Sequence, residues 1–252
     1  MILTDAQLDR YARHIILKEV GGGGQLRLLR SHVLVVGAGG IGSPALQYLA
    51  AAGVGRLTIV DNDSVDASNL QRQTIYGTAD LGTPKVEAAA AALARLTPDT
   101  RVEARCQRVD AATAPALLDG VDVVLDGCDN FATRLAVADA ALALCVPLVS
   151  AAVGAWEGQL GVFRGWEGNL PCYRCFVGHD PERADTSCAD QGVVGAVTGV
   201  VGSMAALEVI RALVPFGDDQ AGRLWLFDAL AGRTRTIRLP KDPACPACGA
   251  PA

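Results

Sequence analysis

The stretch Val33-Leu-Val-Val-Gly37-Ala-Gly-Gly-Ile-Gly42 decides the fold of this chain. Its four leading apolar residues are typical of a short, buried strand in a parallel sheet. The glycines that follow, at the spacing G-x-G-x-x-G, permit a tight turn and let a phosphate approach backbone N–H groups at a helix N-terminus. The stretch therefore predicts a strand, a nucleotide-binding loop and a helix that continues to about Ala52. A glycine turn that holds no ligand is the alternative.

Outward from this unit, short apolar strands alternate with helical segments. Further strands are expected at 56–60, 102–105, 121–125, 147–150, 159–163, 223–227 and 233–238. Thr83 and Pro84 predict the start of one intervening helix, with Thr83 as its N-cap and Pro84 at its first position. This alternation specifies a parallel sheet covered by helices. We therefore expect an α/β fold, a Rossmann-like and mostly parallel sheet with helices on both faces, continued by antiparallel strands in the C-terminal part.

Two more segments have a helical pattern. Residues 5–18 are expected to form one amphipathic helix with Leu8, Tyr11, Ile15 and Ile16 on its apolar face. The four glycines at 21–24 should end it, before a short helix that continues to about residue 30. Near the other end, residues 192–207 carry no charge, but this run of 16 residues is shorter than the ~20 that span a bilayer. It predicts a buried helix over 192–213 and no membrane association.

The composition bounds the function. The chain has 252 residues, 50% of them hydrophobic, and a formal net charge of −5. The hydrophobic content is enough for a substantial core. The negative net charge argues against a general nucleic-acid binder, which usually carries a basic face. Residues 1–7 lack the basic region and the long apolar stretch of a signal peptide, so a cytoplasmic location is expected. In that reducing compartment the 8 cysteines are not expected to form structural disulfides.

Two C-x-x-C pairs lie far apart in the sequence, Cys172 with Cys175 and Cys245 with Cys248. Each spacing lets two thiolates bind one tetrahedral zinc, so together the pairs predict a closed, structural Cys₄ zinc site. A dithiol redox site would need only one pair. Cys188 is different, because it lies in a polar loop before a helix, where the helix amides would favour a nucleophilic thiolate. An inert loop cysteine is an equal alternative there.

Polar residues follow the predicted strand ends. Asp61 closes the second strand, where a carboxylate accepts hydrogen bonds from ribose hydroxyls. Lys85 lies in the first turn of a helix, where a cation opposes the helix dipole at a cost of about 0.3–1 kcal/mol unless an anion is near. With Arg72 it predicts a phosphate site. Asp129 has the ligand chemistry of Mg²⁺, although it would also serve as the cap of the helix that starts near Asn130. Together these groups favour an enzyme that handles ATP over a plain dehydrogenase.

Taken in order, these motifs resemble those of the ThiF/MoeB/HesA family, the bacterial relatives of ubiquitin-activating enzymes. The match runs across nearly the whole chain, and the combination is specific although each motif alone is weak. It rests on Arg10-Tyr-Ala-Arg13-His, the 37–42 loop, Asp61-Asn-Asp63, Ser68-Asn-Leu-Gln-Arg72-Gln, Gly82-Thr-Pro-Lys85, Asp126-Gly-Cys-Asp129-Asn130, both cysteine pairs and the Cys188 loop.

The resemblance implies an adenylyltransferase that uses ATP and Mg²⁺. Such an enzyme activates the C-terminal glycine carboxylate of a small ubiquitin-like sulfur carrier, a protein that ends in Gly-Gly, as an acyl-adenylate and releases pyrophosphate. The implied ATP-binding residues are Gly37, Gly39, Gly40, Gly42, Asp61, Asp63, Ser68, Asn69, Leu70, Gln71, Arg72, Gln73, Lys85, Asp129 and Asn130.

The resemblance also implies roles for single residues. Arg72 and Lys85 would hold the phosphates, Asp129 would bind Mg²⁺, and Arg13 would reach the ATP of the neighbouring subunit in a homodimer. The paired cysteines would be structural Zn²⁺ ligands. Cys188 matches a cysteine that some members use for covalent sulfur or carrier chemistry and others do without.

The expected organisation is a single adenylation domain over residues 1–252. It comprises N-terminal helices in 1–30, a nucleotide-binding part in 31–155, and a carrier-binding and zinc part in 156–252. Because the chain ends soon after Cys248, sulfur delivery is expected from a separate sulfurtransferase.

Three other functions stay open at this point. They are an NAD-dependent oxidoreductase, a tRNA-nucleoside-activating dehydratase of the same superfamily, and a zinc-clipped scaffold that only docks a carrier. The carrier itself is also open, since molybdopterin, thiamin, cysteine and tRNA-thiolation routes share these motifs.

Overall fold

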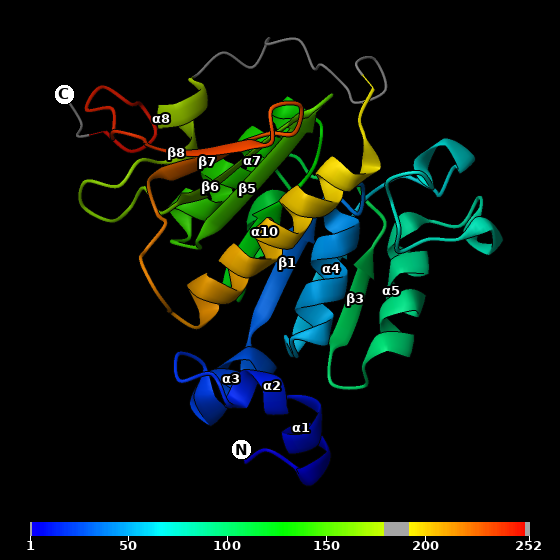
Figure 1. The fold of residues 1–252 in the computed structure, drawn as a ribbon. Coiled ribbons are helices and arrows are strands. Elements are labelled where there is room, and N and C mark those ends of the chain that lie inside the picture. The colour runs from blue at the N-terminus through cyan, green and yellow to red at the C-terminus, as the bar shows by residue number, and fades with distance from the viewer. Residues whose placement is uncertain (1, 179–191, 250–252) are drawn as a thin grey trace.

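Eight strands form one continuous sheet in the computed structural model, which describes residues 2–178 and 192–249 (Figure 1). The strands are β1 His32–Val36, β2 Arg56–Val60, β3 Arg101–Arg105, β4 Val123–Asp126, β5 Leu148–Gly154, β6 Glu157–Phe163, β7 Arg223–Asp228 and β8 Arg233–Arg238. Their order in the sheet is β3-β2-β1-β4-β5-β6-β7-β8. The first five in this order run parallel, and β6, β7 and β8 are added antiparallel. The predicted mixed sheet is confirmed.

Helices cover both faces of the parallel half of the sheet. One face packs against α4 Gly42–Ala51, α5 Lys85–Leu96 and α10 Gly195–Leu213, and the other against α6 Ala114–Leu118 and α7 Phe131–Ala143. Figure 1 shows α4 beside α10 in front of the sheet and α7 behind it. The remaining described helices are α1 Asp5–Arg10, α2 Ala12–Ile15, α3 Gly21–Arg30, α8 Tyr173–Val177 and the 3₁₀ turns η1 Ala67–Asn69 and η2 Thr78–Asp80. Of these, α1, α2 and α3 gather at the end of the sheet where β1 begins.

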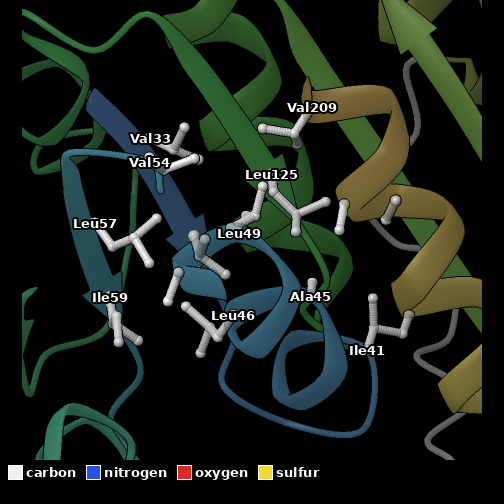
Figure 2. Packing of buried hydrophobic residues seen from close by; sticks show 14 of the residues in the cluster. Val33, Ile41, Ala45, Leu46, Leu49, Val54, Leu57, Ile59, Leu125 and Val209 are labelled. Atoms are coloured by element: carbon white, nitrogen blue, oxygen red, sulfur yellow. The ribbon is translucent and has the colours of Figure 1, made fainter. Parts of the chain in front are cut away.

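The packing of β1 explains why its sequence is a continuous apolar run. All five residues are buried, because successive side chains point to two faces that are both covered. Val33 packs in one cluster with Leu46 and Leu49 of α4 (Figure 2), whereas Leu34 belongs to the cluster on the α7 side. Each fully buried leucine contributes about 1.5–3 kcal/mol through burial. This packing holds β1 rigidly, and with it the glycine loop that follows.

The N-terminal segment differs from the single amphipathic helix that the sequence predicts. It forms two short helices, α1 and α2, which are separated at Tyr11. Tyr11 is buried, as expected, but Leu8 and Ile16 are 43% and 78% exposed. The break arises because the Tyr11 hydroxyl donates a hydrogen bond to Asp99 at 2.8 Å, which fixes this residue against the loop before β3. A tertiary contact therefore overrides the helical pattern.

Two further local predictions were wrong. The four glycines at 21–24 do not end a helix but form the first turn of α3. Packing requires a glycine at only one of these positions, because a Cβ on Gly24 would lie 2.8 Å from a methyl group of Val214. Thr83 is not the cap of α5, since Pro84 occupies the N-cap position and Lys85 begins the helix. The Lys85 N–H is satisfied instead by the Asp63 carbonyl at 2.9 Å.

Helix α10 is long and apolar enough to cross a membrane by length and composition alone, with a mean hydropathy of 1.5. In the described fold it packs against α4 and against strands β4, β5 and β6. Val201, Ala205 and Val209 on this side are fully buried. These contacts identify α10 as a core helix, in agreement with the sequence-based prediction.

Candidate functional site

One large cavity, of about 1290 Å³, opens at the carboxyl ends of β1, β2 and β4. It continues beyond β5 across one face of β6, β7 and β8. In a parallel sheet this edge is where ligands bind, because strand ends, loops and helix N-termini converge there. The predicted residues that line the cavity are Gly37, Gly39, Gly40, Asp61, Asp63, Asn69, Arg72, Gln73, Lys85, Asp129 and Asn130.

The glycine loop is shaped by backbone contacts that only glycine permits at two positions. Gly37 has φ +90°, in the left-handed region, and lies against the backbone of Gly127 and Cys128. A Cβ on Gly42 would lie 2.0 Å from the Gly37 carbonyl oxygen. Gly42 therefore does not line the cavity but lets α4 begin directly under the loop. The hydroxyl of Tyr76 donates to the Ala38 carbonyl at 2.8 Å and holds the loop from outside.

Asp61 is fixed beside this loop by two backbone N–H groups. Its carboxylate accepts from Ala38 and from Asp63, each at 2.8 Å. Burial raises the pKa of Asp61, while the positive charge of Lys85 and the two N–H donors oppose that rise. The carboxylate is thus held in one orientation at the place expected for ribose recognition.

Two cations face the cavity near Asp61. Lys85, in the first turn of α5, is almost fully buried and pairs with Asp63 at 2.7 Å. Asp63 is the anion that offsets the unfavourable position of Lys85 at a helix N-terminus. Arg72 follows η1 and donates to the Ser68 carbonyl at 3.0 Å, which leaves its charge without a described acidic partner.

Three predicted residues of this segment do not line the cavity. The Ser68 hydroxyl donates to Asp66 at 2.6 Å and so closes the η1 turn. Leu70 packs against the hydrophobic core, and Gln71 is exposed, with its carbonyl against Gly195. Gln73, by contrast, is buried at the cavity wall, and its Oε1 atom has no partner among the described residues. That orphan acceptor points to a ligand donor in the cavity.

The loop after β4 carries the predicted magnesium ligand. Asp129 is exposed to the cavity, and its carboxylate makes no hydrogen bond or ion pair with a described residue. The cap of α7 is Asn130, whose side chain accepts from the Thr133 N–H at 2.9 Å. The alternative in which Asp129 caps this helix is therefore wrong. A free carboxylate beside a phosphate-binding loop fits the ligand chemistry of Mg²⁺.

Arg134, which the sequence analysis did not single out, supports this loop. Its guanidinium donates to Asp126 at 3.0 Å, to the Ser150 hydroxyl at 3.1 Å, and to the carbonyls of Ala151 and Cys128. Burial lowers the pKa of Arg134, but the Asp126 charge raises it and prevails, so the guanidinium stays charged. Burial and the same carboxylate raise the pKa of the Cys128 thiol, which keeps that sulfur protonated.

The far part of the cavity lies over the antiparallel strands, within the part expected to bind the carrier, but the sequence analysis singled out none of its lining residues. Its lining includes Ala152, Gln159, Leu226, Arg233 and Arg235 from the sheet, and Tyr173, Phe176 and Val177 from α8. We call this part the tail groove. The one signal in the sequence was the two-residue alternation of arginines along 233–238, which places two of them on one face of a strand.

Two predicted residues lie elsewhere. Arg13, on α2, is exposed and is not part of the cavity lining. Helix α2 lies with α1 and α3 near the start of β1, at the end of that strand opposite the glycine loop (Figure 1). Cys188 lies outside the described residues.

The four paired cysteines come together as the spacing predicts. Their Sγ atoms all lie within 4.8 Å of one another. Individual separations are 3.8 Å for Cys172 and Cys175, 3.7 Å for Cys172 and Cys245, and 3.4 Å for Cys175 and Cys248. A tetrahedral zinc with Zn–S bonds of about 2.3 Å has sulfurs ~3.8 Å apart. The cluster is consistent with zinc, and Arg174, within the first pair, anchors it to α7 through Asp139 at 2.7 and 2.8 Å.

Comparison with known proteins matches these features. The family model described as "ThiF family" matches residues 11–247. The "Adenylyltransferase and sulfurtransferase MOCS3" of Bos taurus is 50% identical over 249 residues, 98% of this chain but 54% of the relative. This chain therefore spans about half the length of that relative. The "SAMP-activating enzyme E1" of Haloferax volcanii is 46% identical, with 98% of this chain and 91% of the relative covered. The "Sulfur carrier protein adenylyltransferase" of Thermus thermophilus is also 46% identical, with 98% and 92% covered.

Solved structures share the fold at low sequence identity. The E. coli MccB structure with ATP is similar with a TM-score of 0.79 at 20% identity, over 98% of this chain and 75% of that one. PaaA is similar with a TM-score of 0.81 at 19% identity, over 96% and 76%.

Proposed function

The chain belongs to the ThiF family, and from that premise we propose that it is an ATP-dependent adenylyltransferase for a small ubiquitin-like sulfur carrier. The main observation behind the proposal is that one cavity joins the predicted nucleotide-binding residues to the tail groove. The glycine loop, Arg72, Lys85 and Asp129 lie at one end, and the tail groove continues from it across the antiparallel strands. A nucleotide and an extended peptide tail would meet between them. The names of two relatives, a sulfur carrier adenylyltransferase and a SAMP-activating E1, support this substrate class.

The reaction joins the carrier to AMP. An oxygen of the carrier's terminal glycine carboxylate attacks the α-phosphorus of ATP, the bond to the β-phosphate breaks, and pyrophosphate leaves with that electron pair. A carboxylate is already ionised at neutral pH, so no general base is needed. Catalysis is then positioning and charge stabilisation. Gly37, Gly39 and Gly40 would bring backbone close to the phosphates, and Asp61 would orient the ribose.

Lys85 and Arg72 are the two cations that would stabilise the negative charge of the phosphates. Lys85 is positioned by Asp63 and by the start of α5, and Arg72 by the Ser68 carbonyl. Both would stabilise the negative charge that grows on the leaving pyrophosphate. Asp129, held in place by the Arg134 network, would bind Mg²⁺, which when present neutralises phosphate charge.

A homodimer is the proposed assembly. Arg13 does not line the cavity of its own chain, so its proposed phosphate contact is to the ATP of a second subunit. Tyr48 of α4 and Val200 and Leu207 of α10 are exposed large apolar residues on two helices that pack against each other. A second copy of the chain is the proposed cover for that face.

The remaining assignments extend this proposal. The Cys₄ cluster would hold a structural Zn²⁺, and Cys188 would have a covalent role only if the enzyme also handles sulfur. Residues 31–155 would serve as the nucleotide-binding part and 156–252 as the carrier-binding and zinc part of a single domain. A cytoplasmic location, where thiols stay reduced, is part of the proposal, and a separate sulfurtransferase would deliver sulfur there.

The test is ATP–pyrophosphate exchange with candidate carriers. We expect exchange only in the presence of a carrier that ends in Gly-Gly, and none with the same carrier lacking its last glycine. Lys85→Ala and Arg72→Ala should each lower exchange by about a hundred- to a thousand-fold, as loss of one charge-stabilising group does elsewhere.

The matched control is Lys18→Ala, because the Lys18 side chain is 90% exposed and remote from the cavity lining. It should leave exchange unchanged. Full activity of both site variants, or tight NADH binding without ATP binding, would contradict the proposal.

A further inference from the structure

The floor of the tail groove has a regular composition that the adenylation chemistry does not explain. Directly opposed residues on β5, β6, β7 and β8 form a row across the strands: Ala152, Gln159, Leu226 and Arg235. All four line the cavity. The row changes from a small residue on β5, the strand that pairs with β4, to a cation on the outer strand β8. This inference rests on the proposed function, because it concerns how the groove reads the carrier.

A second row runs beside the first and carries two carboxylates, but neither of them lies directly opposite Arg235. It consists of Gly154, Glu157, Asp228 and Arg233, which also line the cavity. Arg233 lies opposite the Asp228 carboxylate in the strand register, whereas Arg235 lies opposite the apolar Leu226. Neither arginine is within 4.0 Å of an acidic group of the described residues. Arg235 is thus a cation in the groove with no facing carboxylate.

Strand geometry fixes how far Arg235 lies along a bound tail. Three strand spacings of about 4.8 Å separate β5 from β8, roughly 14 Å in all. An extended peptide advances about 3.3–3.6 Å per residue. A tail that crosses the strands with its last glycine near Ala152 therefore passes Arg235 at about the fourth residue before its end. There it leaves the sheet, because β8 is the edge strand (Figure 1).

We infer that Arg235, assisted by Arg233, binds a carboxylate side chain of the carrier where the tail leaves the groove. The recognised chemistry is an acidic residue at or just beyond the fourth position before the terminal glycine. Ile237, on the same face of β8 and 42% exposed, adds an apolar contact next to that carboxylate. Bonds between a guanidinium and a carboxylate are charge-assisted and frequently bidentate, so this contact selects among carriers as well as holding one.

Arginines on an edge strand also have a simpler role, since they discourage edge-to-edge aggregation. Arg238 separates the two explanations. It is exposed on the same edge strand, but alternation places it on the opposite face, and it is not part of the cavity lining. Protection of the edge would involve Arg235 and Arg238 alike, whereas carrier recognition involves Arg235 and not Arg238.

The test uses two synthetic peptides that end in Gly-Gly and carry either glutamates or lysines at about the fourth to sixth residues before the end. Their affinities for the full-length protein are measured by fluorescence anisotropy in the presence of ATP. We expect the acidic peptide to bind about tenfold more tightly, as a charge-assisted contact predicts. Arg235→Glu should abolish or reverse that preference, Arg235→Gln should abolish it, and Arg238→Glu should retain it.

Three outcomes would overturn the inference: a wild-type preference that survives Arg235→Glu, an equal loss in Arg238→Glu, or no binding of either peptide. Thermal unfolding of the variants shows whether they are folded, and β8 is exposed enough to accept both changes. Exchange of pyrophosphate into ATP, measured with the acidic peptide, tests the proposed function separately. A charge preference without exchange overturns adenylation only, and exchange without a preference overturns the Arg235 contact only.

Discussion

The parallel and antiparallel halves of the sheet are built by different rules. In the parallel half β1 and β4 are buried along their whole length, because helices cover both faces. In the antiparallel half the outer strand β8 is exposed at every residue, and α10 packs against only one face of β5 and β6. The comparison shows how one sheet provides a rigid nucleotide platform where it is covered and a binding surface where it is open.

The charged groups of the two halves differ in the same way. Arg134, in the parallel half, is buried and satisfied by Asp126, Ser150 and backbone carbonyls. Arg235, in the antiparallel half, is exposed and faces Leu226. The first network orients a loop before any ligand arrives, whereas the second cation has its counter-charge outside the chain. The loop at the nucleotide end is therefore preorganised, whereas the tail groove is the part that selects among carriers.

Metal removal should have the largest effect, and only on the antiparallel half. The cysteine cluster joins residues that are 73 positions apart, Cys172 and Cys245, so a bound zinc closes a long loop. In the chain-entropy treatment of a cross-link, a loop of this length contributes about 4 kcal/mol. A strong chelator, or Cys245→Ser, should lower the free energy of unfolding by roughly that amount. Amide hydrogen exchange should become faster in α8 and β8 and stay slow in β1 and α4.

Cys106→Ser is the matched control, because Cys106 is an exposed cysteine outside the cluster. It should change neither stability nor exchange. If β1 lost protection as much as β8 after chelation, the two halves would form one cooperative unit and the comparison would break.

Truncation of one leucine in each half should give the next largest effect. Leu46 of α4 is fully buried against β1 (Figure 2), whereas Leu226 of β7 is half-buried and lines the tail groove. Leu46→Ala should cost about 2–5 kcal/mol, since it leaves a cavity in a closed core. Leu226→Ala should cost about 1 kcal/mol because less apolar area is removed from a packed environment. Urea unfolding of both variants measures the difference, and equal losses would contradict it.

Parts of the fold that depend on local sequence could be predicted, whereas parts that depend on contacts with distant residues could not. Strands such as β1 and β2 were located nearly to the residue, because burial on both faces leaves a continuous apolar run. The glycines at 21–24 and the break at Tyr11 were misjudged, and in both places a residue from far along the chain makes contact, Val214 at Gly24 and Asp99 at Tyr11. Local propensity carries no information on such contacts.

The candidate site shows a similar division. Asp61, Lys85 and Asp129 were identified because they stand at strand ends or helix starts, where chain position alone implies a role. Arg134 and Arg235 were not, because their importance depends on which strands become neighbours in the sheet. The parallel register of β4 with β5 brings Asp126 opposite Ser150, and only then does Arg134 have its partners.

The smallest expected effect is a pH dependence of stability that arises from a histidine in the parallel half of the sheet. His32, in β1, donates from Nδ1 to the Gly120 carbonyl and accepts from the Thr58 hydroxyl at Nε2, an assignment that these partners dictate. Burial lowers the pKa of His32 below its ordinary 6.5. As pH falls, His32 is therefore protonated in the unfolded chain before it is protonated in the folded chain. The stability contributed by neutral His32 is present above pH ~6.5 and is lost as pH falls from there through the folded pKa. Each pKa unit of lowering costs about 1.4 kcal/mol in acid.

His32→Gln keeps a donor and an acceptor at this position but removes the titration. The variant should lose less stability than the wild type between neutral and mildly acidic pH. Urea unfolding of both proteins at two pH values on either side of the ordinary histidine pKa measures this. An identical pH slope would show that acid acts elsewhere, in which case the open half, with the exposed carboxylate Glu157 and the half-buried carboxylate Asp228, is the place to mutate next.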